Sequence, residues 1–76
     1  MTTVNISGAR IKKVREKRGM DQVELAAALH VNFNIKIDQS DISEIERGVR
    51  GIKDFELDAI AHVLNVSPLW LLRGEE

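Results

Sequence analysis

The 76-residue chain contains no cysteine and no tyrosine, and it has a single proline and a single tryptophan. Without cysteine, it has no disulfide framework and no thiolate zinc site to stabilise it. It also lacks any apolar run near the roughly 20 residues that cross a bilayer, and its first ten residues lack the apolar block of a signal peptide. A chain of this length holds one small domain, so we expect a soluble, cytoplasmic domain whose core comes from helix packing.

The formal net charge of −1 hides an uneven distribution. Residues 1–37 carry seven basic and three acidic residues, whereas residues 38–76 carry four basic and nine acidic residues. The basic segment is compatible with attraction to phosphates, with a solvated face, or with pairing to the acidic half. The near-neutral total argues against indiscriminate polyanion binding and leaves a localised nucleic-acid site open.

Helix signals begin after a polar segment, residues 1–7, which we expect to form a flexible N-terminal arm. Apolar residues among charged ones predict a first helix from Gly8 to Arg18, which stops at Gly19. Asp21 and Glu24 have the spacing of a capping box and predict the start of a second helix. The sequence leaves the end of this helix open, because residues 30–34 could extend it by a turn and Asn32 and Asn34 are both good stop residues.

Three further helices follow from the remaining capping signals. Asp38 predicts the start of a short third helix that ends before Gly48, and Asp54 is expected to cap a fourth. Ser67–Pro68 predicts the start of a fifth helix, which ends at Gly74. The predicted fold is therefore all-α, with one five-helix domain over residues 8–74.

The second and third predicted helices have the form of a helix-turn-helix unit. In such a unit the second helix can enter a major groove about 12 Å wide. Ile42 and Ile45 are expected to turn toward the core, which leaves Ser40 and Glu44 as neighbours on the opposite face of the same helix. This arrangement points to DNA binding.

Three segments, DQVELAAAL, QSDISEIERGVR and FELDAIAHVLNVSPLWLLRG, together resemble the Cro/CI-type (XRE-like) helix-turn-helix family of bacterial and phage transcriptional regulators. The chain is similar to the DNA-binding domains of lambdoid phage repressors over residues 8–74. The resemblance implies a five-helix lambda-repressor-like fold and a sequence-specific regulator, expected to be a repressor. It would bind double-stranded DNA at a palindromic operator as a homodimer, in the bacterial cytoplasm and associated with the nucleoid.

The resemblance also implies roles for individual residues. The positions that match base-reading ones are Gln39, Ser40 and Glu44. Those expected to contact the DNA backbone are Gln22, Arg47, Arg50 and Lys53, which Arg10 joins as a basic residue of the first helix. Arg15 and Glu46 match a pair that the family often uses as an internal salt bridge between its first and third helices.

Two features depart from the family pattern. Ile42 follows Leu29 by 13 positions, which is longer than the usual spacing, so the connection between the second and third helices is lengthened. We expect the insertion within the segment from His30 to Ile37, as an elongated second helix or as a protruding turn. The third helix is also unusually acidic, although a carboxylate such as that of Glu44 can accept a hydrogen bond from a cytosine amine.

Other signals favour ordinary structural roles. His30 and His62 have no companion at a metal-ligand spacing. Asp54, Glu56 and Asp58 alternate with other residues, but positions two apart on a helix point in nearly opposite directions and do not converge on one ion. No phosphate-binding glycine loop and no nucleophile–base pair is present. We therefore predict no metal, no cofactor and no enzymatic activity.

Two alternatives remain open. Trp70 is either a core residue or a contact near the fifth helix with a second subunit. The same fold could also serve as a protein-interaction module, antitoxin-like or anti-regulator. In that case the acidic third helix or the inserted segment would hold a partner protein.

Overall fold

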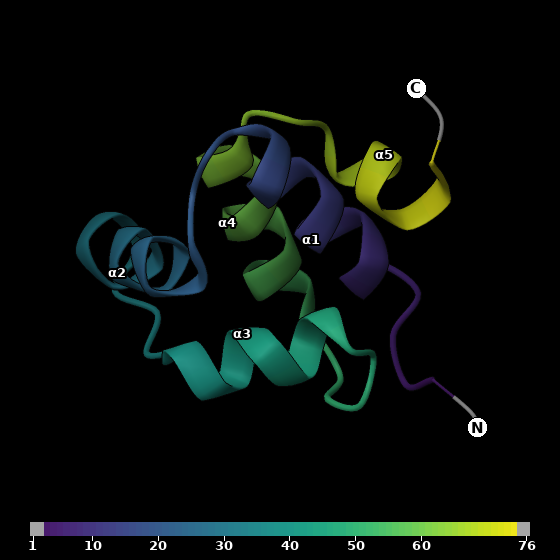
Figure 1. The fold of residues 1–76 in the computed structure, drawn as a ribbon, viewed down its shortest axis with the longest axis horizontal. Helices are drawn as coiled ribbons and strands as arrows, with labels where there is room; N and C mark the ends of the chain where they lie inside the picture. The colour runs from purple at the N-terminus through teal and green to yellow at the C-terminus, as the bar shows by residue number, and fades with distance from the viewer. Residues whose placement is uncertain (1–2, 75–76) are drawn as a thin grey trace.

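The computed structural model describes residues 3–74, which form five α-helices and no strand (Figure 1). In chain order the helices are α1 (Gly8–Lys17), α2 (Gln22–Phe33), α3 (Gln39–Glu46), α4 (Asp54–Leu64) and α5 (Pro68–Arg73). Helices α1 and α4 lie centrally, with α2 to one side, α3 along the lower edge and α5 at the opposite corner from α2 (Figure 1). The all-α, five-helix prediction is confirmed. Within residues 3–74, no helix is long and apolar enough to span a membrane.

One core holds the five helices together. Helices α1 and α2 both pack on α3 and α4, and α5 packs on α4. The core side chains that are fully or almost fully buried are Ile11, Leu25, Leu29, Ile42, Ile45, Ile60, Leu64 and Leu71. Within α2, α3 and α4 they lie three or four positions apart, so each of these helices turns one apolar face inward and leaves the opposite face in solvent.

Helix α1 begins where Gly8 allows an unusually close approach to α3. A Cβ on Gly8 would overlap the backbone carbonyl oxygen of Ile45, so glycine lets these two helices meet here. The helix ends at Lys17, one residue earlier than predicted, because Arg18 already acts as the C-cap. Gly19 then takes a left-handed conformation at φ +69°, as its predicted role as a helix stop requires.

The lengthened connection between α2 and α3 is mainly an extension of α2. A capping box of Asp21 and Glu24 starts this helix as predicted, and the helix continues to Phe33. Asn34 ends it in the left-handed conformation at φ +54°. Ile37 then returns to the core, with 4% of its surface exposed, and leads into α3. Of the two predicted forms of the insertion, the structure shows the elongated second helix.

The caps of the last three helices agree with the sequence except at α4. Asp38 accepts from the N–H of Asp41 at the start of α3, and Ser67 accepts from the N–H of Trp70 at the start of α5. The predicted cap Asp54 is instead the first residue of α4, and Lys53 is the N-cap. The sequence prediction was one residue late because the N-cap position lacks a capping side chain.

Candidate nucleic-acid interface

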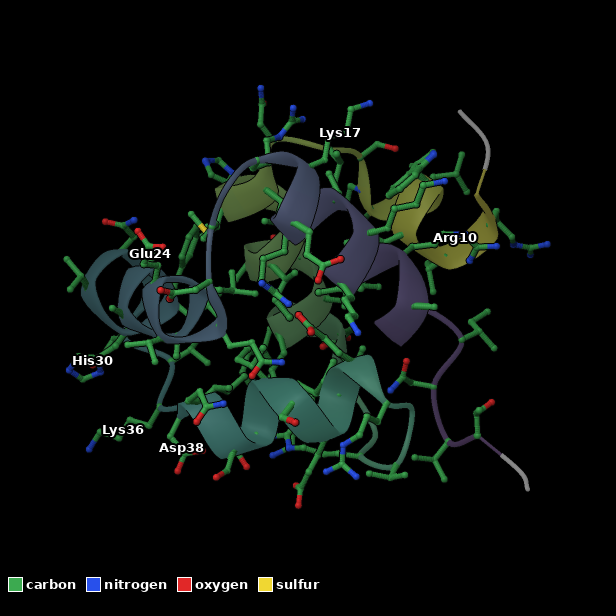
Figure 2. The ribbon with its side chains drawn as sticks, viewed as in Figure 1. Arg10, Lys17, Glu24, His30, Lys36 and Asp38 are labelled. Carbon is green, nitrogen blue, oxygen red and sulfur yellow. The ribbon has the colours of Figure 1, made fainter. Side chains whose placement is uncertain are left out.

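The outer face of α3 is open to solvent. Gln39, Ser40 and Glu44 are all exposed, whereas Ile42 and Ile45 on the inner face are fully buried. In Figure 2 the side chains of α3 project from the lower edge of the molecule, where Lys36 and Asp38 mark its beginning. Gln39 and Ser40 lie in the first turn of α3, so the extended α2 does not cover these two side chains.

A polar network ties this surface to the body of the domain. The Gln39 side-chain amide donates to Gln22 Oε1 at 2.7 Å, and Gln22 Nε2 donates to Glu46 Oε1 at 3.0 Å. Glu46 in turn accepts from Arg15 through Nε at 2.6 Å and through Nη2 at 3.0 Å. Arg15 also donates to the carbonyl oxygen of Met20 at 2.8 Å. This chain of hydrogen bonds links α1, α2 and α3 and sets the position of Gln39.

The Arg15–Glu46 pair lies in the interior, where 8% of the Arg15 side chain and 2% of the Glu46 side chain are exposed. The structure thus brings together the two residues that the sequence assigned to a structural salt bridge. The hydrogen bond to Glu46 raises the pKa of Arg15 above its ordinary value. A bidentate guanidinium–carboxylate pair has a narrow range of geometries, so it fixes the orientation of α3 against α1.

At the other end of α3, Arg50 is held by carboxylates. Its Nη1 and Nη2 each donate to a Glu56 oxygen at 3.2 Å, and its Nε lies 3.8 Å from an Asp41 oxygen. Arg50 was predicted as a phosphate contact, but most of its charge is used inside the domain. This pairing could not be predicted from the sequence, where Glu56 is only one of three alternating acids.

Glu56 has a second structural role. It is 4% exposed, and it accepts from the backbone N–H of Lys53 at 2.9 Å at the start of α4. Burial acts to raise the pKa of its carboxyl, but the hydrogen bonds from Arg50 and the Lys53 N–H outweigh burial, so that pKa lies below its ordinary value. Glu56 therefore fixes the loop between α3 and α4.

Arg47 and Lys53 flank the C-terminal end of α3, and both are exposed. Within residues 3–74, neither forms an ion pair with a carboxylate. The Lys53 Nζ lies 5.9 Å from the centre of the Phe55 ring, close enough for a cation–π contact. Two of the predicted backbone-contacting cations thus stand beside the exposed α3 surface.

Arg10 does not reach this surface. Figure 2 shows it beside α5, and its Nη1 donates to the carbonyl oxygens of Ile6, Leu71 and Leu72 at 3.2–3.3 Å. The last carbonyls of a helix lack partners within the helix and carry partial negative charge, which a cation stabilises. The structure therefore places this predicted DNA contact at the end of α5.

The predicted arm adds contacts that the sequence did not reveal. Asn5 Nδ2 donates to the carbonyl oxygens of Ile45 at 3.0 Å and Arg50 at 2.8 Å, so the arm is tied to the end of α3. The Asn5 Oδ1 accepts from the N–H groups of Ser7 and Gly8 at 3.0 and 2.7 Å. The first two residues of the predicted arm lie outside the described part of the chain.

No cluster of three or more histidine, aspartate or glutamate residues within residues 3–74 could hold a metal ion. His62 instead packs edge-on against Phe33, with ring centres 5.4 Å apart. This contact joins α4 to the extension of α2. Trp70 is half-buried and lines a groove beside α1.

Known helix-turn-helix proteins are similar to this chain in sequence and in fold. Residues 11–71 match the model of a family described as helix-turn-helix. The chain is similar to the P22 c2 repressor in complex with a synthetic operator, with a TM-score of 0.78 and 27% identity over 93% of this chain and 98% of that one. It is also similar to SinR, a master regulator for biofilm formation, in complex with DNA, with a TM-score of 0.74 and 31% identity over 87% of this chain and 97% of that one.

A third similar structure is C.AhdI, a restriction-modification controller protein from Aeromonas hydrophila. Its TM-score is 0.73, and it is 26% identical over 86% of both chains. No curated protein matches this chain.

Five packed helices with a helix-turn-helix formed by α2 and α3 define a class of small DNA-binding domains. The family match spans most of the chain, and the similar structures cover nearly all of it. This chain belongs to the helix-turn-helix family of Cro/CI-type regulators, as the resemblance implied.

Proposed function

We propose that this chain is a sequence-specific transcription regulator, a repressor, that places α3 in the major groove of DNA. The observation that carries the proposal is the open outer face of α3, held in register by the network from Gln39 through Gln22 and Glu46 to Arg15. A helix about 10–12 Å in diameter fits a major groove about 12 Å wide. The P22 c2 repressor and SinR, which share this fold, are each described in complex with DNA.

Base reading is assigned to Gln39, Ser40 and Glu44. Gln39 uses one amide N–H toward Gln22, which leaves its amide oxygen and its other N–H for a base. This remaining pair suits adenine, which offers an acceptor and a donor side by side in the major groove. Ser40 can donate or accept, and the Glu44 carboxylate can accept from a cytosine amine.

Contacts to the DNA backbone are assigned to Gln22, Arg47 and Lys53. Gln22 lies at the start of α2, and the two cations lie past the end of α3, so phosphates are held at both ends of the recognition surface. Such contacts set the orientation of the protein and carry no sequence information. Arg50 is assigned a lesser phosphate role, because Glu56 and Asp41 already offset its charge.

The regulator is proposed to act as a symmetric homodimer on an inverted repeat. Leu69 and Leu72 of α5 are 51% and 38% exposed, an apolar face that a second copy could cover. Two recognition helices related by a two-fold axis would read half-sites one turn of DNA apart, about 34 Å. Repression then follows from occupancy of the operator, without any catalytic activity, and takes place in the cytoplasm.

Selection of bound sequences from a random DNA pool at fixed salt tests this function. We expect an inverted repeat whose half-sites are one helical turn apart. A pool that shows no enriched sequence would contradict sequence-specific binding. An enriched site without two-fold symmetry would contradict the dimer and leave base reading standing.

The alternative, a module that only holds a partner protein, has less support, because the similar structures include complexes with DNA. SinR is also described in a complex with SinI, so a protein partner is compatible with this fold. Salt dependence separates the two functions. Binding through phosphates weakens steeply as salt is raised, and a DNA affinity that does not change with salt would favour the protein module.

A further inference from the structure

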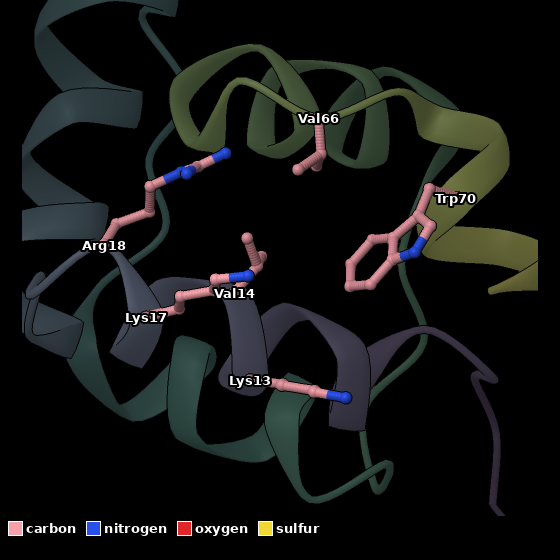
Figure 3. Close-up of a pocket in the computed structure, with 6 residues that line it drawn as sticks. All are labelled: Lys13, Val14, Lys17, Arg18, Val66 and Trp70. Atoms are coloured by element: carbon pink, nitrogen blue, oxygen red, sulfur yellow. The ribbon is translucent and has the colours of Figure 1, made fainter. Parts of the chain in front are cut away.

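A groove lies between α1 and the segment that joins α4 to α5 (Figure 3). It has a volume of about 260 Å³. Its lining residues are Lys13, Val14, Lys17, Arg18, Val66 and Trp70. None of the proposed DNA-contacting residues belongs to it, so it is a separate feature of the domain.

The walls of the groove are apolar. Val14 is 5% exposed and forms part of the core, while Val66 and Trp70 are half-buried. Figure 3 shows the indole ring of Trp70 facing Val14 across the groove, with Val66 above them. A flat apolar or aromatic group could occupy this space and stack against the indole.

The rim of the groove is basic. Lys13 and Lys17 are one turn apart on α1, both exposed, and within residues 3–74 neither pairs with a carboxylate. Arg18 donates to the carbonyl oxygens of Leu64 at 2.9 Å and Asn65 at 3.3 Å, so its charge is partly offset by the C-terminal end of α4. Among residues 3–74, no acidic side chain lines the groove. In the described part of the chain, Lys13 and Lys17 therefore stand at the rim of an apolar slot without an acidic partner.

We propose that this groove binds a small aromatic carboxylate. The ring lies against Trp70, and the carboxylate pairs with Lys13 and Lys17. The volume is below the roughly 300–1,000 Å³ of pockets for drug-sized ligands, so the ligand is limited to about one fused ring system. Because the site is open and the lysines are solvated, the dissociation constant is on the order of a millimolar.

Trp70 makes the proposal directly testable. It is the only tryptophan of the chain, so the indole N–H gives a single, assigned signal in a nitrogen–proton NMR spectrum. The probes are naphthalene-2-carboxylate and its neutral isostere naphthalene-2-carboxamide, titrated separately into the free protein. We expect the carboxylate to shift the Trp70 signal saturably and the carboxamide to bind about tenfold more weakly. Equal binding of the two probes, or no saturable shift, would overturn the proposal.

The basic rim is tested with Lys13→Gln and Lys17→Gln combined. We expect this double variant to bind naphthalene-2-carboxylate about tenfold more weakly, with no change toward the carboxamide. The matched control is Lys12→Gln, an exposed lysine of α1 that does not line the groove. Equal loss in the control would mean that only the general positive charge of α1 is sensed, and this would refute the site. All measurements use protein without DNA, so their failure is distinct from failure of the proposed regulatory function.

Discussion

The two ends of α3 use their polar side chains differently. At the N-terminal end, Gln39 and Ser40 are exposed, and Gln39 has a neutral hydrogen bond to Gln22. At the C-terminal end, Glu46 is buried in an ion pair with Arg15, and Arg50 is engaged by Glu56. The N-terminal end of α3 therefore has free hydrogen-bond donors and acceptors, whereas Glu46 and Arg50 at the C-terminal end are paired within the domain.

This difference explains how an acidic helix can face DNA. Glu46 is neutralised inside the domain, and Asp41 serves the capping box of α3 and lies close to Arg50. Of the acids in this helix, Glu44 alone is exposed without such a partner. The acidic composition therefore overstates the negative charge that would meet phosphates.

The largest effect is expected from breaking the buried pair. Glu46→Gln leaves the Arg15 guanidinium without a counter-charge and should lower the free energy of unfolding by about 3 kcal/mol. Glu44→Gln, on the exposed face of the same helix, should change it by less than about 0.5 kcal/mol. Thermal and denaturant unfolding of both variants measures this. Equal stability of the two would show that the pair does not fix α3.

The second prediction concerns Glu56, which holds the loop after α3, and the pH dependence of its contribution to the free energy of unfolding. Glu56→Gln should cost about 2 kcal/mol at neutral pH, because Arg50 and the Lys53 N–H lose a charged acceptor. The pKa of Glu56 is lower in the folded protein than its ordinary value of 4.5, so its stabilisation is full above that pH and is lost as the pH falls through the folded pKa.

The measurement is a series of unfolding curves from neutral to strongly acidic pH. The stability gap between the wild type and Glu56→Gln should be constant above about pH 5 and shrink below it. A gap that widens on acidification would contradict the assigned direction of the pKa shift. Asp58→Gln, an exposed position on the same helix, is the control and should show a much smaller gap.

At the N-terminal end of α3, a substitution should weaken DNA binding and leave the stability of the fold unchanged. Gln39→Ala should weaken binding to the selected operator by about 1–2 kcal/mol and relax the preference at one base pair of each half-site. Asn32→Ala, on an exposed part of α2, should leave affinity unchanged. Competition binding with single-base operator variants gives the result. An unchanged base preference would remove Gln39 from the reading surface.

The smallest expected effect is a change in the salt dependence of DNA binding, which distinguishes Arg47 from Arg10. Arg47→Ala should weaken binding to all sequences alike and reduce the slope of log affinity against log salt by about 0.9. Arg10→Ala removes the same charge beside α5 and should leave that slope unchanged. Titrations at three or more salt concentrations compare the two. Equal slope changes would mean that the whole charge of the domain is sensed and not a local contact.

The sequence was sufficient for the helices because their limits are encoded locally. The capping boxes at Asp21 and Asp38, and the Ser67 cap, each need only residues within one turn. The exposed face of α3 followed from its two buried isoleucines. The length of α2 did not, because Asn32 and Asn34 are both suitable stop residues, and the contact of Phe33 with α4 that accompanies the longer helix joins residues far apart in the chain.

The roles of the arginines were also difficult to predict from the sequence. Arg15 could be paired with Glu46 only through a family pattern, since the two are 31 positions apart. Arg10 and Arg50 both look like free cations in sequence, yet one satisfies the end of α5 and the other satisfies Glu56. Such partners are set by tertiary packing, which charge patterns along the chain do not record.

Mapping the DNA contact on the protein itself tests the central claim most directly. Backbone amide signals of the labelled protein are followed by NMR while the selected operator duplex is added. We expect the largest shifts at Gln22, Gln39, Ser40 and Arg47, and little change at Lys12 on the exposed face of α1. If the largest shifts fall on α1 and α5 while α3 is unaffected, α3 is not the recognition helix.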